Sequence, residues 1–146
     1  MPENPALEAL RAVKNSDANT RKQINACMKE GETYYTRLDQ ITTIQEIFRN
    51  ALDNQQKNYT FSNDPQALPL LQKLQISKLT YTHNELSSLS ERLDAEAKIL
   101  PNKANLAFQK ASALLSVAEQ VLKIGAEMVK SNRKEVETYL SRIRGQ

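Results

Sequence analysis

Histidine and cysteine, the side chains most often used in nucleophilic catalysis and metal binding, each occur once in this chain, as His83 and Cys27. A zinc site or a Ser-His-Asp triad would have to be built around His83 alone. Because His83 lies in the polar run Thr80–Asn84, we interpret it as a surface or half-buried side chain. Cys27 stands beside Met28 in an apolar pattern, which indicates a buried thiol rather than a reactive one.

Phosphate loops and acid–base pairs are equally hard to find. The glycines Gly31, Gly125 and Gly145 are isolated from one another, which excludes the glycine-rich nucleotide-binding motifs. Asp and Glu together number 17, but their spacing marks no pair as general acid and base. We therefore predict no catalytic residue, no metal and no cofactor, and we do not expect an enzyme.

Basic residues gather near the end of the sequence. The candidate basic patch consists of Lys130, Arg133, Lys134, Arg142 and Arg144. Cations of this kind can contact phosphates, but Glu127, Glu135 and Glu137 are interleaved with them and no nucleic-acid-binding motif accompanies them. A solvated helix face is the favoured interpretation, and docking on an acidic partner is the alternative. Nucleic acid and membrane surfaces are disfavoured as partners.

The amino-acid composition predicts the type of secondary structure in which these residues lie. The 146 residues include only 3 Gly, 5 Pro and 5% aromatic side chains, with 40% hydrophobic and 25% charged residues. Few turn formers and few aromatics disfavour a many-stranded fold, whereas this balance suits amphipathic helices. A single cysteine forms no internal disulfide. We predict an all-α protein, an elongated antiparallel bundle or coiled coil of about three long helices.

Two parallel ladders of residues, each with a step of seven, dominate the pattern. The small-residue ladder is Ser90, Ala97, Ala104, Ala111, Ala118 and Gly125. The bulky ladder is Phe108, Leu115, Leu122, Val129, Val136 and Ile143. Steps of three and four residues place both on one stripe of a helix, and small residues let a neighbouring helix approach closely. The predicted helix-packing seam is Ala97, Ala104, Ala111, Ala118, Gly125, Leu115, Leu122 and Val129.

Breaks in the apolar pattern suggest the helix limits. The first helix is strongest over residues 24–52, and cap-forming residues at 15–17 interrupt it, which separates an N-terminal arm or short helix (1–16) from a single bundle domain (17–146). The second helix is predicted over residues 68–100 and the third over 102–143. Pro101 predicts a tight turn between them, although one long helix kinked at Pro101 would also keep the ladder in phase.

Apolar and aromatic residues crowd the connection after the first helix. This candidate docking cluster consists of Tyr59, Phe61, Leu68, Leu70 and Leu71. An apolar cluster at a helix connection either caps the end of the core or presents a docking surface, and capping is the favoured interpretation.

These features favour a non-enzymatic helical interaction module: an adaptor, chaperone or assembly factor that contacts another protein through helices or associates with itself. The alternative is a polymerising or stalk-like subunit of a bacterial secretion-type apparatus. Apolar helices joined by Asn63-Asp64-Pro65 loosely resemble the helical hairpins of secretion needles, but such subunits lack a third long helix. With no cleavable signal peptide visible, we expect a cytoplasmic protein, or one exported without a cleaved signal.

Overall fold

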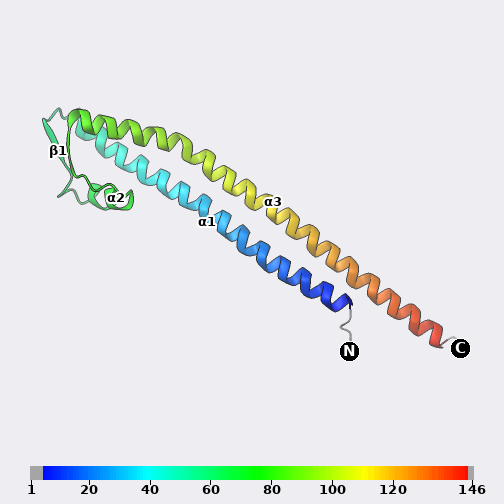
Figure 1. Ribbon diagram of the computed structural model, residues 1–146. Coiled ribbons are helices and arrows are strands. Elements are labelled where there is room, and N and C mark those ends of the chain that lie inside the picture. Colours follow the sequence, from blue (N-terminus) through cyan, green and yellow to red (C-terminus); the bar gives the residue numbers. More distant parts are fainter. Residues whose placement is uncertain (1–4, 145–146) are drawn as a thin grey trace. The chain divides into compact units, whose positions relative to one another are not determined.

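The computed structural model describes residues 5–144, except for the side chains of Ala6 and Ile143. The described chain is mostly helical, which confirms the all-α prediction (Figure 1). Its elements are α1 (Pro5–Asp53), β1 (Asn58–Thr60), α2 (Ala67–Lys73), β2 (Thr80–Thr82) and α3 (His83–Arg144). Three helices are present, but only two are long: α1 has 49 residues and α3 has 62, whereas α2 has 7.

The chain divides into two compact units. The central unit is Lys29–Ala107, and the terminal unit combines the residues up to Met28 with those from Phe108 onward. Each unit contains one stretch of α1 and one stretch of α3. The predicted domain limits at 1–16 and 17–146 do not coincide with these units and stay a prediction.

The helix break predicted at residues 15–17 is absent, because α1 continues through them. Side chains at this point form hydrogen bonds within the helix. The hydroxyl of Thr20 donates to the carbonyl of Ser16 at 2.8 Å, and Arg21 Nε donates to Asp17 Oδ2 at 3.0 Å. Both pairs are four residues apart, the spacing at which side chains meet on a helix. Cap-forming residue types therefore do not end the helix here.

The core of the central unit forms where α1, α3 and the intervening segment meet. Phe48 is fully buried, and its ring centroid lies 5.2 Å from that of Phe61 and 6.5 Å from that of Tyr81. The buried cluster around them also contains Ile41, Ile44, Tyr59, Ala67, Leu71, Leu74, Leu86, Leu89, Leu93 and Leu100. Three- and four-residue spacing in α1 and α3 brings these apolar side chains to one side of each helix.

The region predicted as the second helix, 68–100, is not one helix: α2 ends at Lys73, residues 74–82 are not helical and include β2, and α3 begins at His83. The strands β1 and β2 pair antiparallel, with Tyr59 opposite Tyr81. Both tyrosines are buried, while the neighbouring residues on each strand are exposed. This alternation is what a two-residue period in a half-buried strand produces.

The end of α2 explains why the long helix does not form there. Gln75 adopts a left-handed backbone conformation with φ of 61°. The backbone N–H of Ile76 donates to the carbonyl of Leu71 at 2.8 Å, and that of Gln75 donates to the carbonyl of Gln72 at 3.0 Å. These bonds are those of a Schellman helix end, which glycine usually supplies. At the other end of α2, the Asp64 carboxylate accepts hydrogen bonds from the backbone of Gln66 and Ala67.

The tight turn predicted at Pro101 is wrong, because α3 passes through this proline as one helix (Figure 1). The alternative was one long helix kinked at Pro101: its continuity is confirmed, and the kink stays a prediction. Leu93, Leu100 and Ala104 are buried on both sides of the proline. Packing of this common face holds the helix together although proline removes a backbone donor.

Polar contacts join α1 to α3 within the central unit. Tyr35 donates to the Asn105 side chain at 3.3 Å, and Gln45 donates to the carbonyl of Ser90 at 3.2 Å. Between these two contacts, Arg37 forms an ion pair with Glu96.

Candidate interaction surfaces

The small-residue ladder lies in the helix contacts, whereas most of the bulky ladder after the half-buried Phe108 is exposed. Ala104, Ala111 and Ala118 are 0%, 3% and 5% exposed, and Gly125 is buried. Ala97 is half-buried against the central core. By contrast Leu115, Leu122 and Val129 are 50%, 43% and 36% exposed. In the terminal unit the described helix α1 covers the small residues and leaves the larger ones at its edge. Ile143 lies outside the described side chains.

Gly125 lies at a close approach of α1 to α3 in the terminal unit. A Cβ atom built on Gly125 would lie 3.1 Å from Cγ1 of Val13 and 3.4 Å from its Cγ2. Contacts at 3.1 Å are tighter than carbon atoms ordinarily tolerate. The glycine therefore permits a helix separation that a larger residue would widen, as the small-residue ladder predicts.

Ala104→Leu is expected to destabilise the central unit by about 1–3 kcal/mol, because a larger side chain must overpack a site with 0% exposure. Urea unfolding followed by circular dichroism measures the change. Gln109→Leu on the exposed surface of the same helix is the matched control and is expected to be nearly neutral. Equal stability of the two variants would remove Ala104 from the seam.

The candidate docking cluster belongs mainly to the core. Tyr59, Phe61 and Leu71 are 3%, 4% and 0% exposed, so they do not present a docking surface. Leu68 and Leu70 are half-buried. Tyr59, Phe61 and Leu71 therefore belong to the buried core, and capping of its end stays a prediction.

His83 and Cys27 belong to different units of the chain. His83 is exposed at the first turn of α3, with Nδ1 3.3 Å from the hydroxyl of Tyr59. Cys27 is 7% exposed, which confirms the predicted burial of its thiol. Within residues 5–144, no group of three His, Cys, Asp or Glu side chains could hold a metal ion.

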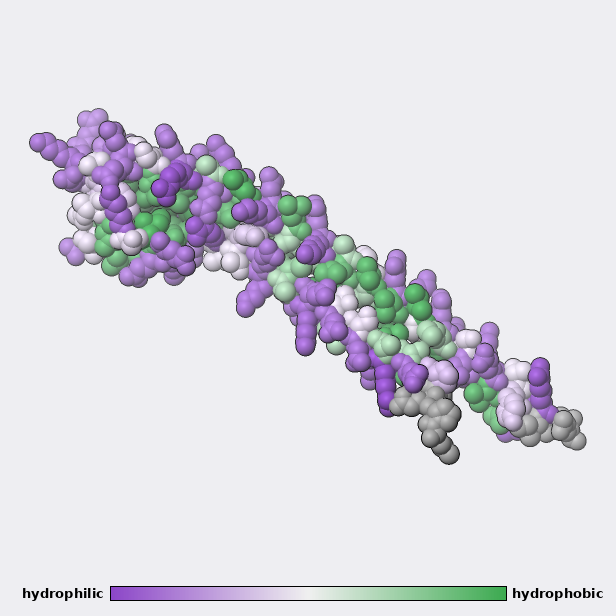
Figure 2. All heavy atoms as spheres, viewed as in Figure 1, coloured by the Kyte–Doolittle hydropathy of each residue, from purple (hydrophilic) through white to green (hydrophobic). Residues whose placement is uncertain are grey.

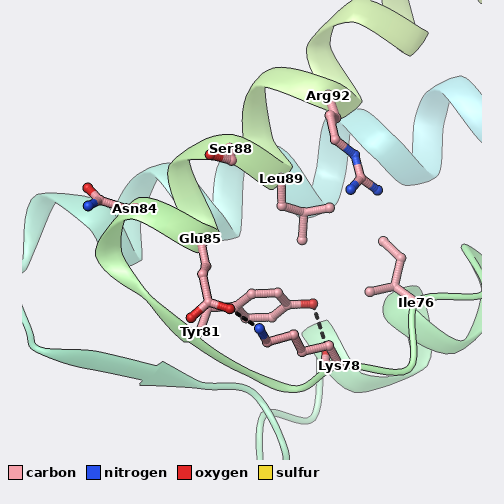
Figure 3. Close-up of a pocket in the computed structure, with 8 residues that line it drawn as sticks. All are labelled: Ile76, Lys78, Tyr81, Asn84, Glu85, Ser88, Leu89 and Arg92. Carbon is pink, nitrogen blue, oxygen red and sulfur yellow. Dashed lines mark hydrogen bonds and ion pairs between the residues drawn. The ribbon is translucent and has the colours of Figure 1, made fainter.

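A groove of about 420 Å³ lies beside the start of α3 in the central unit (Figure 3). Lys78 pairs with Glu85, and its Nζ lies 5.6 Å from the centroid of the Tyr81 ring. Desolvation by burial raises the pKa of the Tyr81 phenol, and the positive charge of Arg92 opposes this shift. Arg92 and Ile76 point toward one another across the groove (Figure 3). The groove combines cations with an apolar floor, and the residues lining it supply no nucleophile with an adjacent base.

Threonine and glutamate fix the local structure at this groove. The backbone N–H of Glu85 donates to the Thr82 hydroxyl, and the Glu85 carboxylate accepts from the backbone N–H of Thr82, both at 3.2 Å. This reciprocal arrangement is a capping box, which begins α3 directly after β2. The spacing Thr-x-x-Glu is visible in the sequence. It lies inside the helix predicted over residues 68–100, so no helix start was predicted there.

A second groove of about 420 Å³ lies between α1 and α3 in the terminal unit. We call it the Asp17 groove, and its lining consists of Asp17, Arg21, Ile24, Asn25, Leu115, Ala118, Glu119 and Leu122. Arg21 donates to Oδ2 of Asp17. The other carboxylate oxygen, Oδ1, is buried and has no hydrogen-bond partner among the described residues. A buried acceptor without a donor is unfavourable.

Large apolar side chains are exposed along the part of α3 that belongs to the terminal unit. Figure 2 shows hydrophobic side chains on one face over this stretch of the chain. The exposed set is Leu115, Val117, Leu122, Ile124, Met128, Val129, Val136, Tyr139 and Leu140. Leu115, Leu122 and Val129 share one side of α3, whereas Val117, Ile124 and Met128 lie on nearly the opposite side. Exposed apolar stripes of this length are typical of interaction sites.

The candidate basic patch is only partly brought together. Lys130, Arg133, Lys134, Arg142 and Arg144 are all exposed on α3. Lys130 and Arg133 line one shallow groove with Lys123 and Val129. Arg142 follows Arg133 by nine positions, which places it about 180° around the helix. The other four cations fall within about 100° of one another, so they share one side of α3 and Arg142 lies on the opposite side.

Among residues 5–144, none of the helices combines the length and the apolar character needed to cross a membrane. In comparisons with known proteins, no family model, no curated protein and no solved structure matches the chain.

Proposed function

We propose that the protein is a non-enzymatic helical interaction module, an adaptor, chaperone or assembly factor that binds another helix on the terminal unit. The observation that carries this proposal is the exposure of the bulky ladder: Leu115, Leu122 and Val129 stand 36–50% exposed beside a buried row of small residues. A helix laid along this row would cover them, in the manner of helix-in-groove recognition.

The proposal includes the arrangement of the two long helices. We infer that α1 and α3 form an antiparallel coiled coil within each unit. In the central unit, the order of the contacts from Tyr35–Asn105 to Gln45–Ser90 supports this arrangement. In the terminal unit, the approach of Val13 to Gly125 supports it. Two helices bury only one narrow stripe each, so the wider apolar face of α3 is available to a partner.

Site-specific photo-crosslinking in cells tests this function. A photoreactive residue at Leu122 is expected to capture a protein, because this side chain is 43% exposed on the apolar face. Gln120 is the matched control, since it is exposed on the same helix but lies about 160° further around it. Protein adducts at position 122 and none at position 120 are the expected result. Adducts at neither position, or equally at both, would contradict the proposal.

A further inference from the structure

The last turns of α3 extend past the described part of α1. Val13 lies opposite Gly125, and Ala9 and Leu10 line a small cavity with Met128 and Val129. In these contacts, the residue number in α1 and the residue number of its partner in α3 add up to about 138. By the same register Pro5, where α1 begins, lies opposite residue 133. We call residues 134–144 the C-terminal overhang, since no described residue of α1 lies opposite them.

The overhang has the character of a docking helix. Val136, Tyr139 and Leu140 are 51%, 66% and 44% exposed. Their spacing of three and four residues places them on one helical stripe, the pattern of anchor residues that enter an apolar groove. Arg133, seven residues before Leu140, and Arg144, four residues after it, lie on the same side of the helix as Leu140. Glu137 also lies on this side, four residues after Arg133 and three before Leu140, so the anchors have two cations and one anion beside them.

The Asp17 groove has the complementary character. Leu115 and Leu122 form its half-exposed apolar walls, with the buried Ala118 between them in sequence. Its carboxylates are Asp17 and Glu119, and Arg21 is its one cation among the described lining residues. Oδ1 of Asp17 is buried without a donor. A guanidinium group is a suitable donor for such an oxygen, because it forms charge-assisted hydrogen bonds to carboxylates.

We propose that the C-terminal overhang of one molecule docks in the Asp17 groove of a second copy. This inference rests on the proposed function and names its partner. The apolar anchors fit between the leucine walls, and the basic residues near them meet the acidic rim. Charge complementarity of this kind fixes orientation and register as well as adding attraction.

The overhang cannot fill the groove of its own molecule. Ala118 in the groove and Tyr139 in the overhang belong to one uninterrupted helix. Twenty-one residues separate them, which at the helical rise is about 31 Å. A contact between two different surfaces on identical molecules is heterologous, so each added copy leaves a free overhang and a free groove. Repeated docking would then lengthen the assembly copy by copy, as expected of a polymerising subunit.

Light scattering over a concentration series tests the docking. An overhang of this size makes a small contact, so growth is expected across the range from about 10 μM to about 1 mM. The mass-average molar mass of the wild type is expected to rise at least twofold over this range, and added salt is expected to reduce the rise. The double variant Tyr139→Ser, Leu140→Ser should remain a monomer. Wild-type mass that stays at the monomer value would overturn the proposal.

Two lysine substitutions distinguish the role of the Asp17 groove from that of the other exposed apolar residues of α3. Leu122→Lys places a cation in the groove and should abolish growth, whereas Ile124→Lys changes an equally large exposed residue outside the groove and should not. Loss of growth in both variants, or in neither, contradicts the assigned groove. Both substitutions are at half-exposed positions, and circular dichroism verifies that the helices persist.

Mixing the two assembly-deficient variants provides the decisive measurement. The Tyr139→Ser, Leu140→Ser variant keeps an intact groove, and Leu122→Lys keeps an intact overhang. Together they should form a 1:1 pair of twice the monomer mass that grows no further. A mixture that remains monomeric overturns docking of the overhang in the groove. If position 122 then crosslinks to a different protein, the proposed function stands and only the second copy is excluded as partner.

Discussion

Phe48→Ala is expected to lower the free energy of unfolding of the central unit by about 3–5 kcal/mol. The Phe48 side chain is fully buried, and its ring packs against those of Phe61 and Tyr81. Truncation removes the ring contacts with the segment between the two long helices and leaves a cavity at their meeting point. Because a domain is stabilised by only about 5–15 kcal/mol, this loss is a large fraction of the total.

Urea unfolding monitored by circular dichroism and tyrosine fluorescence measures this effect. Leu106→Ala is the matched control: this leucine belongs to the same unit but is 64% exposed, so its truncation should cost much less. A loss below about 1 kcal/mol for Phe48→Ala would contradict its central place in the core. The fluorescence is informative because Tyr59 and Tyr81 lie in the same cluster.

The core contribution of α1 could be predicted from the sequence because it follows helical periodicity. Ile41, Ile44 and Phe48 recur at steps of three and four, and all three are completely buried. The same periodicity predicted the small-residue ladder, of which Ala104, Ala111 and Ala118 are buried. Spacing identifies a buried stripe since every turn of a helix presents the same side to its neighbour.

The hairpin and α2 could not be predicted by that reasoning. Leucines at 68, 71, 79, 86 and 89 continue the apolar pattern through residues that are not one helix. The helix end after α2 rests on Gln75 in a left-handed conformation, where glycine would have given a visible signal. In β2, three residues are too few for a two-residue period to stand out.

The candidate site was predicted only in part. Spacing put Ala118 and Leu115 on one stripe, yet Ala118 is 5% exposed and Leu115 is 50% exposed. Which of the two is covered depends on how many helices share the seam, and a single sequence does not contain that number. The unpaired oxygen of Asp17 depends on contacts between two segments far apart in the sequence, and residue types alone do not reveal it.

Pro101→Ala is expected to raise the free energy of unfolding by about 2 kcal/mol. A proline inside a helix costs about 3 kcal/mol relative to alanine, because it lacks a backbone donor and its ring crowds the preceding turn. Pro101 is half-buried, so replacing the ring loses about 1 kcal/mol of apolar burial. Removing the cost of proline inside the helix stabilises the protein by more than this loss. The carbonyl of Ala97 also recovers its hydrogen-bond partner.

Thermal and urea unfolding of the variant test this expectation against Asn102→Ala, an exposed neighbour where only helix propensity changes, by about 0.5 kcal/mol. A gain several times that of the control supports a proline that is tolerated because Leu93, Leu100 and Ala104 hold the helix on the core. A destabilised Pro101→Ala protein would instead mean that these buried residues pack only on a helix bent by the proline. In that case the proline determines the packing of the core, and the ladder stays in phase through Pro101 only because the bend brings Ala104 back onto α1.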